Sequence, residues 1–175
     1  YQDMGIGAAS IELDDEAGIL SDQTGYDKEV ETYAELKTFM EDDYKSAPKN
    51  GDSYVIKIKS GVTSLFADNY IWLNQSEKYR FEADSPVTIY QDLDCYQSFV
   101  AVTAGTDITL DMGSNISLDG SEGSDGPITV YDASLTIKNV TIENYDSGNA
   151  SAVDVFGGKA ILENVEIKDF STGYY

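Results

Sequence analysis

The sequence predicts an all-β protein whose body is a parallel β-solenoid of about five coils, with one short helix before it. Three observations lead to this prediction: a helix start signal near residue 32, a series of short apolar segments after it, and a repeat of about 25 residues in the last third of the chain. A length of 175 residues favours a single domain. We expect this domain to span residues 32–175, after an irregular or extended N-terminal arm formed by residues 1–31.

The helix is expected over residues 33–45. Thr32 is followed three residues later by Glu35, which is the spacing of a capping box. The segment 47–52 (Ala-Pro-Lys-Asn-Gly-Asp) is rich in helix breakers and ends the pattern. Between these signals, apolar residues recur at helical intervals; they are Tyr33, Leu36, Met40 and Tyr44.

Short apolar segments bounded by Ser, Gly, Asp or Asn follow the helix, as is typical of an all-β body. The expected strands are residues 54–58, 70–73, 79–81, 87–90 and 99–102. Between residues 62 and 107 these segments do not follow the 25-residue spacing of the later part, so the sequence does not define the register of the early coils.

The repeat lies in the last third of the chain, where residues 134–145 align with residues 159–170 at an offset of 25. The preceding residues keep the same offset, since Tyr131 aligns with Phe156. A coil of this length cannot bury its own apolar side, so neighbouring coils must stack about 4.8 Å apart and place like residues in columns. Two similar hairpins of a β-sandwich are the alternative, which we disfavour because three units keep the register.

The three units share an Asn-(Ile/Val)-x-(Leu/Ile) pattern that begins at Asn115, Asn139 and Asn164. Asparagines stacked at the same corner of successive coils can hydrogen-bond to one another through their side-chain amides. We therefore expect these three residues to form a structural ladder with buried amides.

Residues 32–61 and the repeat at 115–170 together resemble right-handed parallel β-helix proteins of the pectin-lyase-like type. In those proteins a short capping helix precedes a Gly-Asp turn, here Gly51-Asp52, and the first strand. The resemblance covers residues 32–175 and implies the right-handed form of the parallel solenoid. It leaves function open, because the fold carries lyases, hydrolases, adhesins, tailspikes and envelope proteins.

The composition excludes several classes of protein. With 32 Asp and Glu against 11 Lys and Arg, the net charge of −21 disfavours binding to nucleic acid or to an anionic membrane surface. The absence of histidine excludes Ser-His-Asp and Cys-His triads and His-ligated zinc. No apolar run approaches the roughly 18 residues needed to span a bilayer, so membrane insertion is not expected.

Catalysis would require carboxylates at a fixed separation on adjacent coils, as in glycoside hydrolases. Asp132, Glu143 and Asp154 are the candidates, because Asp132 and Asp154 fall near corresponding repeat positions. Among 32 acidic residues, however, some pair on neighbouring coils is expected by chance. We therefore expect a protein that is not an enzyme and predict no catalytic site.

Calcium is the cofactor that the composition leaves open. The loop 119–126 offers oxygen ligands from Asp119, Glu122 and Asp125, although its spacing matches neither an EF-hand nor a nonapeptide calcium repeat. A solvated turn is the favoured interpretation of this loop, so no cofactor is predicted.

Two kinds of covalent modification are also open. Asn74 and Asn149 begin Asn-x-Ser sequons in turn-like sequence and are the glycosylation candidates. Cys95 is the single cysteine. It is either a small buried hydrophobe or one half of an interchain disulfide.

The expected function is structural. The repeat is still in register at Phe170 without a capping segment, and an open coil invites pairing with another chain. We expect an exported acidic subunit, extracellular or on the cell surface, that assembles with copies of itself through β-edges into a sheath, surface layer or fibre. The alternatives are a β-helix that binds or cleaves carbohydrate, with cell-surface polysaccharide as partner, and an adhesin module of a longer surface protein.

Overall fold

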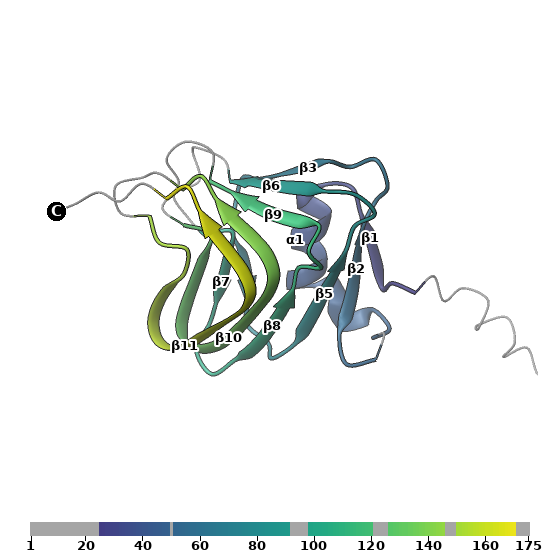
Figure 1. The fold of residues 1–175 in the computed structure, drawn as a ribbon. Helices are drawn as coiled ribbons and strands as arrows, with labels where there is room; N and C mark the ends of the chain where they lie inside the picture. The colour runs from purple at the N-terminus through teal and green to yellow at the C-terminus, as the bar shows by residue number, and fades with distance from the viewer. Residues whose placement is uncertain (1–24, 50, 92–97, 121–125, 146–149, 171–175) are drawn as a thin grey trace, which may run out of the picture.

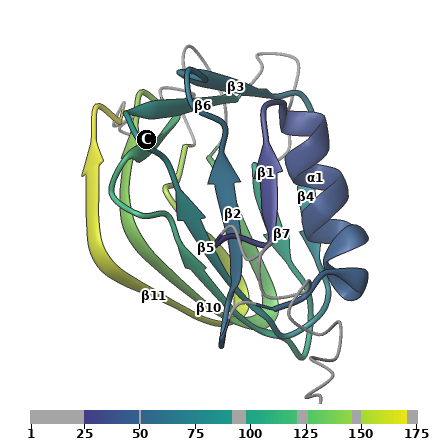
Figure 2. The same ribbon diagram turned by 90° about the vertical axis from the view of Figure 1, so that its right-hand side faces the viewer.

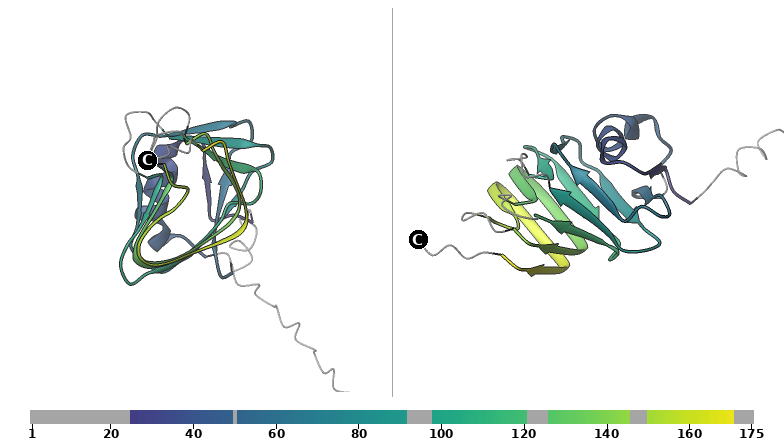
Figure 3. Two further views of the ribbon diagram at one scale, coloured as in Figure 1. Left: turned by 60° about the vertical axis from the view of Figure 1, so that its left-hand side comes forward. Right: turned by 90° about the horizontal axis from the view of Figure 1, so that it is seen from above.

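The computed structural model describes residues 25–49, 51–91, 98–120, 126–145 and 150–170. It confirms the expected fold class, because the chain winds into a parallel β-solenoid of about five turns with one short α-helix (Figure 1). Each pair of neighbouring strands in these residues is parallel. Seen along the stack, the coils lie one over another around a common interior (Figure 3, left).

Three strand stacks, here called faces A, B and C, form the walls of the solenoid. Face A contains β1 (Lys28–Val30), β2 (Tyr54–Ile58), β5 (Lys78–Glu82), β8 (Asp107–Asp111) and the middle of the long strands β10 (Ile128–Glu143) and β11 (Asp154–Lys168). Face B contains β3 (Ser64–Ala67), β6 (Val87–Gln91), β9 (Ile116–Asp119) and the ends of β10 and β11. Face C contains β4 (Ile71–Leu73), β7 (Val100–Val102) and the starts of β10 and β11.

The core consists of inward-facing apolar side chains that stack in columns from coil to coil. On face B, one such column contains Leu65, Ile89, Leu118 and Ile142, and each is at most 2% exposed. Burying a side chain of this size stabilises the fold by about 1.5–3 kcal/mol relative to leaving it in water. Each column therefore ties successive coils together.

The 25-residue repeat is confirmed between β10 and β11, whereas β9 pairs with β10 at a slightly shorter spacing, as in Leu118–Ile142. The early coils depart from the repeat because their corners differ in length from coil to coil. The corner between faces A and B shortens from residues 59–63, 83–86 and 112–115 to Asn139 alone and Asn164 alone, whereas the segment between faces B and C lengthens from residues 68–70 to residues 92–99. Along face A, the number of residues between paired positions rises from the pair Tyr54–Tyr79 to the pair Lys78–Thr109 and falls again at the pair Asp107–Ser134.

The helix α1 spans Tyr33–Glu41 and is followed by a 3-10 helix at Asp43–Ser46, where a single helix over 33–45 was expected. Its capping box is confirmed: the Thr32 side chain accepts from the Glu35 amide, and the Glu35 carboxylate accepts from the Thr32 amide. The α-helix ends because the backbone of Asp42, at φ −130° and ψ −58°, leaves the helical region. No helix in the described ranges is both long and apolar enough to cross a membrane.

The helix α1 covers the first end of the stack and packs beside β1 and β4 (Figure 2). Lys37 donates to the carbonyl of Tyr70 at 2.7 Å, and Glu41 accepts from the amide of Trp72 at 2.8 Å. These side chains satisfy main-chain groups on the outer edge of β4. Residues 28–30, near the end of the expected arm, form β1, so face A begins ahead of the helix.

Candidate functional site

The last coil, β11, is the main exposed feature of the solenoid. It pairs with β10 along one edge, from Thr129–Asp154 to Glu143–Lys168. No residue in the described part of the chain pairs with its other edge. Seen from above, β11 and α1 lie at opposite ends of the stack (Figure 3, right). An unpaired strand edge of this length offers a row of main-chain donors and acceptors to a partner.

Apolar side chains are exposed along β11 because no further coil covers them within the described residues. Val155, Leu162 and Ile167 point inward and are 44%, 40% and 48% exposed. Their partners in β10 are Val130, Ile137 and Ile142, which β11 covers and which are at most 1% exposed. A further coil on β11 would bury its apolar side chains to the same extent. A partner strand on this edge would therefore gain apolar burial as well as hydrogen bonds.

Charges of opposite sign face one another between β10 and β11. Lys138 pairs with Glu163 at 2.7 Å and Lys168 pairs with Glu143 at 3.0 Å, in each case across one coil spacing. The hydrogen bonds to these carboxylates raise the pKa of both lysines. Ion pairs between coils help to fix the register. A shift by one residue would move each charged side chain to the opposite side of the sheet and away from its partner.

The asparagine ladder is shorter than the expected column of three. Asn164 donates to the side-chain oxygen of Asn139 at 2.8 Å, and Asn139 donates to Asp111 at 2.8 Å. Asn115 instead donates to the main-chain carbonyl of Ala83 at 2.7 Å. The longer corner at residues 112–115 places it off the column. The expected burial of the three amides is wrong, because Asn115 and Asn164 are exposed and Asn139 is half-buried.

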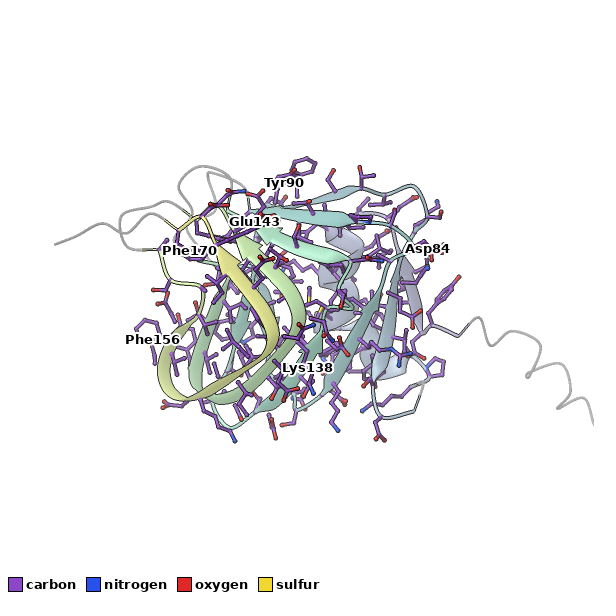
Figure 4. The ribbon with its side chains drawn as sticks, in the orientation of Figure 1. Asp84, Tyr90, Lys138, Glu143, Phe156 and Phe170 are labelled. Atoms are coloured by element: carbon purple, nitrogen blue, oxygen red, sulfur yellow. The ribbon has the colours of Figure 1, made fainter. Side chains whose placement is uncertain are left out.

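An aromatic surface lies on the outside of face C; we use this name for Trp72, Tyr131 and Phe156. The ring centroids of Trp72 and Tyr131 are 6.5 Å apart, and those of Tyr131 and Phe156 are 5.5 Å apart. In the same order, the three residues are 41%, 42% and 61% exposed. The first two rings meet across β7, where the small Ala101 is paired with Trp72. Figure 4 labels Phe156 at the outer margin of the last coil.

A groove of about 330 Å³ adjoins the aromatic surface at Trp72. Charged and amide side chains line it together with Trp72 and Tyr70; they are Lys37, Glu41, Asp42, Lys45, Asn69 and Asn74. Asn74, the first glycosylation candidate, is exposed at this groove. The sequence did not identify this site. From β4 to β10, successive residues of face C are farther apart along the chain than the 25-residue repeat, so the repeat does not predict that Trp72 and Tyr131 are neighbours.

The three candidate catalytic carboxylates do not converge. Asp154 pairs with Thr129 on face C, whereas Asp132 lies at the next corner over Gly157, about three residues or ~10 Å farther along the strand. Glu143 lies on face B in its ion pair with Lys168. Asp132 and Asp154 are therefore not at corresponding repeat positions.

The remaining candidates lie partly outside the described residues. Asp119 is buried and accepts from the Asn144 amide at 2.9 Å. Glu122 and Asp125, which complete the expected calcium loop, fall outside the described ranges, as do Cys95 and Asn149. Among the residues that the structure describes, no three acidic or cysteine side chains are grouped to hold a metal ion.

The fold and its exposed surfaces define a parallel β-solenoid with a helix over one end and, at the other, a coil that no further strand covers within the described ranges. Comparison of the chain with family models, with curated proteins and with solved structures gives no match.

Proposed function

We propose that this protein is a structural subunit of a cell envelope or cell surface that associates with copies of itself through the uncovered edge of β11. The observation that carries the proposal is the combination, on one strand, of an edge that no described residue pairs with and inward apolar side chains that are 40–48% exposed. Sheath, surface-layer and fibre proteins need such a contact. Main-chain pairing supplies affinity and the alternating side chains supply specificity.

The charge of the molecule supports the same proposal. A net charge of −21 keeps the outer faces soluble and opposes lateral aggregation, so contact is directed to the edge of the last coil. An exported, extracellular location and a relationship to pectin-lyase-like β-helix proteins belong to this proposal, since that fold also includes envelope proteins. An adhesin module of a longer surface protein would use the same acidic solenoid as a spacer.

The first experiment measures the mass of the full chain by light scattering across a range of concentrations, with and without calcium. We expect the mean mass to rise with concentration toward at least twice the monomer mass. Leu162→Lys places a charge on the exposed inward column and should abolish the rise, whereas Phe66→Lys on face B should not. A monomer at every concentration and in both solutions would contradict self-association.

The second candidate function is carbohydrate binding, which the aromatic surface and its polar groove favour. Exposed aromatic rings beside amide and carboxylate groups offer both an apolar platform and hydrogen-bond partners, and contiguous apolar patches often mark binding sites. The ligand would be a neutral or cationic saccharide, because the acidic chain repels a polyanion.

Binding to neutral polysaccharides can be measured by affinity electrophoresis. We expect Trp72→Ala and Phe156→Ala to weaken retention. Phe66→Ala is the matched control, because Phe66 is 63% exposed and stacks on Tyr90 at 5.6 Å on a different face. Equal retention of all three variants would exclude the aromatic surface as the binding site.

A further inference from the structure

We infer that two copies of this chain pair through their last coils around a two-fold axis that passes through Ile161. The inference rests on the proposed self-association and specifies its geometry. The two β11 strands would run antiparallel, and the two solenoids would point away from the interface.

The ends of the stack determine which surfaces can meet. The helix α1 packs over the first end against β1, β3 and β4. Its Lys37 bonds to the carbonyl of Tyr70, just before β4, and its Glu41 bonds to the amide of Trp72 within β4. A second copy therefore cannot stack a complete coil on that end without displacing the helix, although β1 and β3 each keep an edge that no described residue pairs with. The last coil can meet another last coil, and two identical surfaces in contact are related by a two-fold axis.

The path of β11 fixes where this axis lies. The strand passes through face C, then face A, then face B, so face A is the middle of the exposed coil. Its segment 159–163 is centred on Ile161. An axis through this centre pairs face A with itself and face B with face C of the other copy. Each residue then meets the partner residue that lies equally far on the other side of Ile161.

This pairing brings opposite charges together across the interface. Lys159 faces Glu163 of the second copy, and Lys168 faces Asp154 of the second copy. By symmetry each contact occurs twice, so four pairs of opposite charge form. Opposite charges directly across an antiparallel pair are favourable, and like charges there are unfavourable.

The same pairing matches the exposed apolar side chains. Val155 faces Ile167 and Ala160 faces Leu162, and in each case both residues point into the solenoid interior. Ile161, which is 39% exposed on the outer side, faces its own copy. The inward columns of the two solenoids would thus join into one continuous core.

Other positions of the axis are less complementary. With the centre moved to Ala160, Asp154 would face Glu166, and Lys159 would face Ile161. With the centre moved to Leu162, Lys168 would face Phe156. An axis between two residues would place inward side chains against outward ones, because strand side chains alternate. Only the axis at Ile161 places a carboxylate of the second copy opposite both Lys159 and Lys168, the latter in addition to its ion pair with Glu143.

One consequence is that pairing through this edge closes at two copies. The contact uses the uncovered coil of both chains and leaves a helix-covered end on each side of the dimer. A sheath, layer or fibre would therefore need an additional contact through another surface.

Disulfide cross-linking tests the position of the axis. In a Cys95→Ser background, Ile161→Cys places two thiols beside the axis, at a separation that a disulfide can span. We expect mild oxidation to give a covalent dimer. Thr136→Cys is the matched control, because Thr136 pairs with Ile161 one coil inward and lies away from the interface. It should remain a single chain.

Charge exchange tests the pairing itself. Lys159→Glu and Glu163→Lys should each raise the dissociation constant of the homodimer about tenfold or more, because each places like charges in two contacts. An equal mixture of these two variants restores both contacts and should regain wild-type affinity. Lys78→Glu changes the charge equally on β5 and should leave the affinity unchanged.

The outcomes separate the two proposals. If the chain associates, but Ile161→Cys gives no covalent dimer and the mixture does not regain affinity, the two-fold arrangement is wrong and self-association stands. If the wild-type chain remains a monomer at every concentration, self-association fails, and this arrangement fails with it.

Discussion

At the residue scale, the corners of the last two coils depend on side chains that accept a left-handed backbone. Asn139 and Asn164 have φ values of 55° and 53°, and Asp132 has a φ of 46°. Asn and Asp tolerate this region better than other residues with a side chain, since their short polar groups bond locally. One such residue turns the chain from one face to the next. The sequence identified the column of Asn139 and Asn164 but not its backbone conformation.

Glycine corners in the third coil give a residue-scale prediction. Gly113 and Gly105 have similar φ values of 74° and 79°, but a Cβ at Gly113 would lie 2.3 Å from the carbonyl oxygen of Phe81, whereas a Cβ at Gly105 meets nothing within 4 Å. Both alanine variants carry the left-handed strain of about 1–2 kcal/mol. We expect Gly113→Ala to cost about 2 kcal/mol more than Gly105→Ala. Urea unfolding measures both, and equal costs would contradict the close approach.

At the element scale, the sequence predicted the elements whose signals are local. The capping box marked the start of α1, and the expected strand at residues 54–58 matches β2. The strand β3 was not predicted, and neither was β8, because the corners around them differ in length and hide the coil period. The aromatic surface was missed for the same reason. Its members come from coils whose spacing along face C, from Trp72 to Ala101 and from Ala101 to Thr129, is longer than the repeat and not constant.

The helix that covers the first coil gives the element-scale prediction. Thr32→Ala removes the side chain that accepts from the Glu35 amide, and we expect it to destabilise the fold by about 1 kcal/mol. Thr38→Ala makes the same substitution at an exposed position inside α1 and should stabilise slightly, because alanine has the higher helix propensity. Thermal unfolding followed by circular dichroism measures both. A loss of stability in both variants, or in neither, would contradict the role of the cap.

At the scale of the whole molecule, the acidic surface carries few basic side chains, and several of these lysines form ion pairs with a carboxylate on a neighbouring coil. Lys49 pairs with Glu77, Lys57 pairs with Asp84, and Lys138 pairs with Glu163, each about one coil apart. These partially exposed pairs contribute modestly to stability. The stacked apolar columns provide the main stabilisation. The sequence predicted the net charge and the columns, but the partners of the lysines required the register of every coil.

Buried tyrosines give a prediction for the whole molecule at alkaline pH. Burial raises the pKa of Tyr79 and of Tyr145 well above the usual value near 10. In the unfolded chain both phenols ionise near pH 10, whereas the folded chain keeps their protons. The unfolded state then binds fewer protons, so the free energy of unfolding is maintained below pH 10 and falls above it.

The measurement is urea unfolding at pH 8 and at pH 11. Tyr145→Phe removes one of the two groups and should reduce the loss of stability between these values, whatever its effect at pH 8. An identical loss in the variant and in the wild type would show that Tyr145 does not contribute.

The constant offset between β10 and β11 makes the length of this molecule adjustable in a fixed unit. Every pair between β10 and β11 has the same offset. A segment that begins at a residue of β10 and ends one residue before the β11 partner of that residue is therefore one coil long, and a second copy inserted after it continues in register. Residues 140–164 are one such segment, since Val140 pairs with Val165. Tandem duplication of this segment would lengthen the solenoid by about 4.8 Å per copy while keeping every column aligned. The early coils lack this modularity, because the spacing between their paired residues changes from coil to coil.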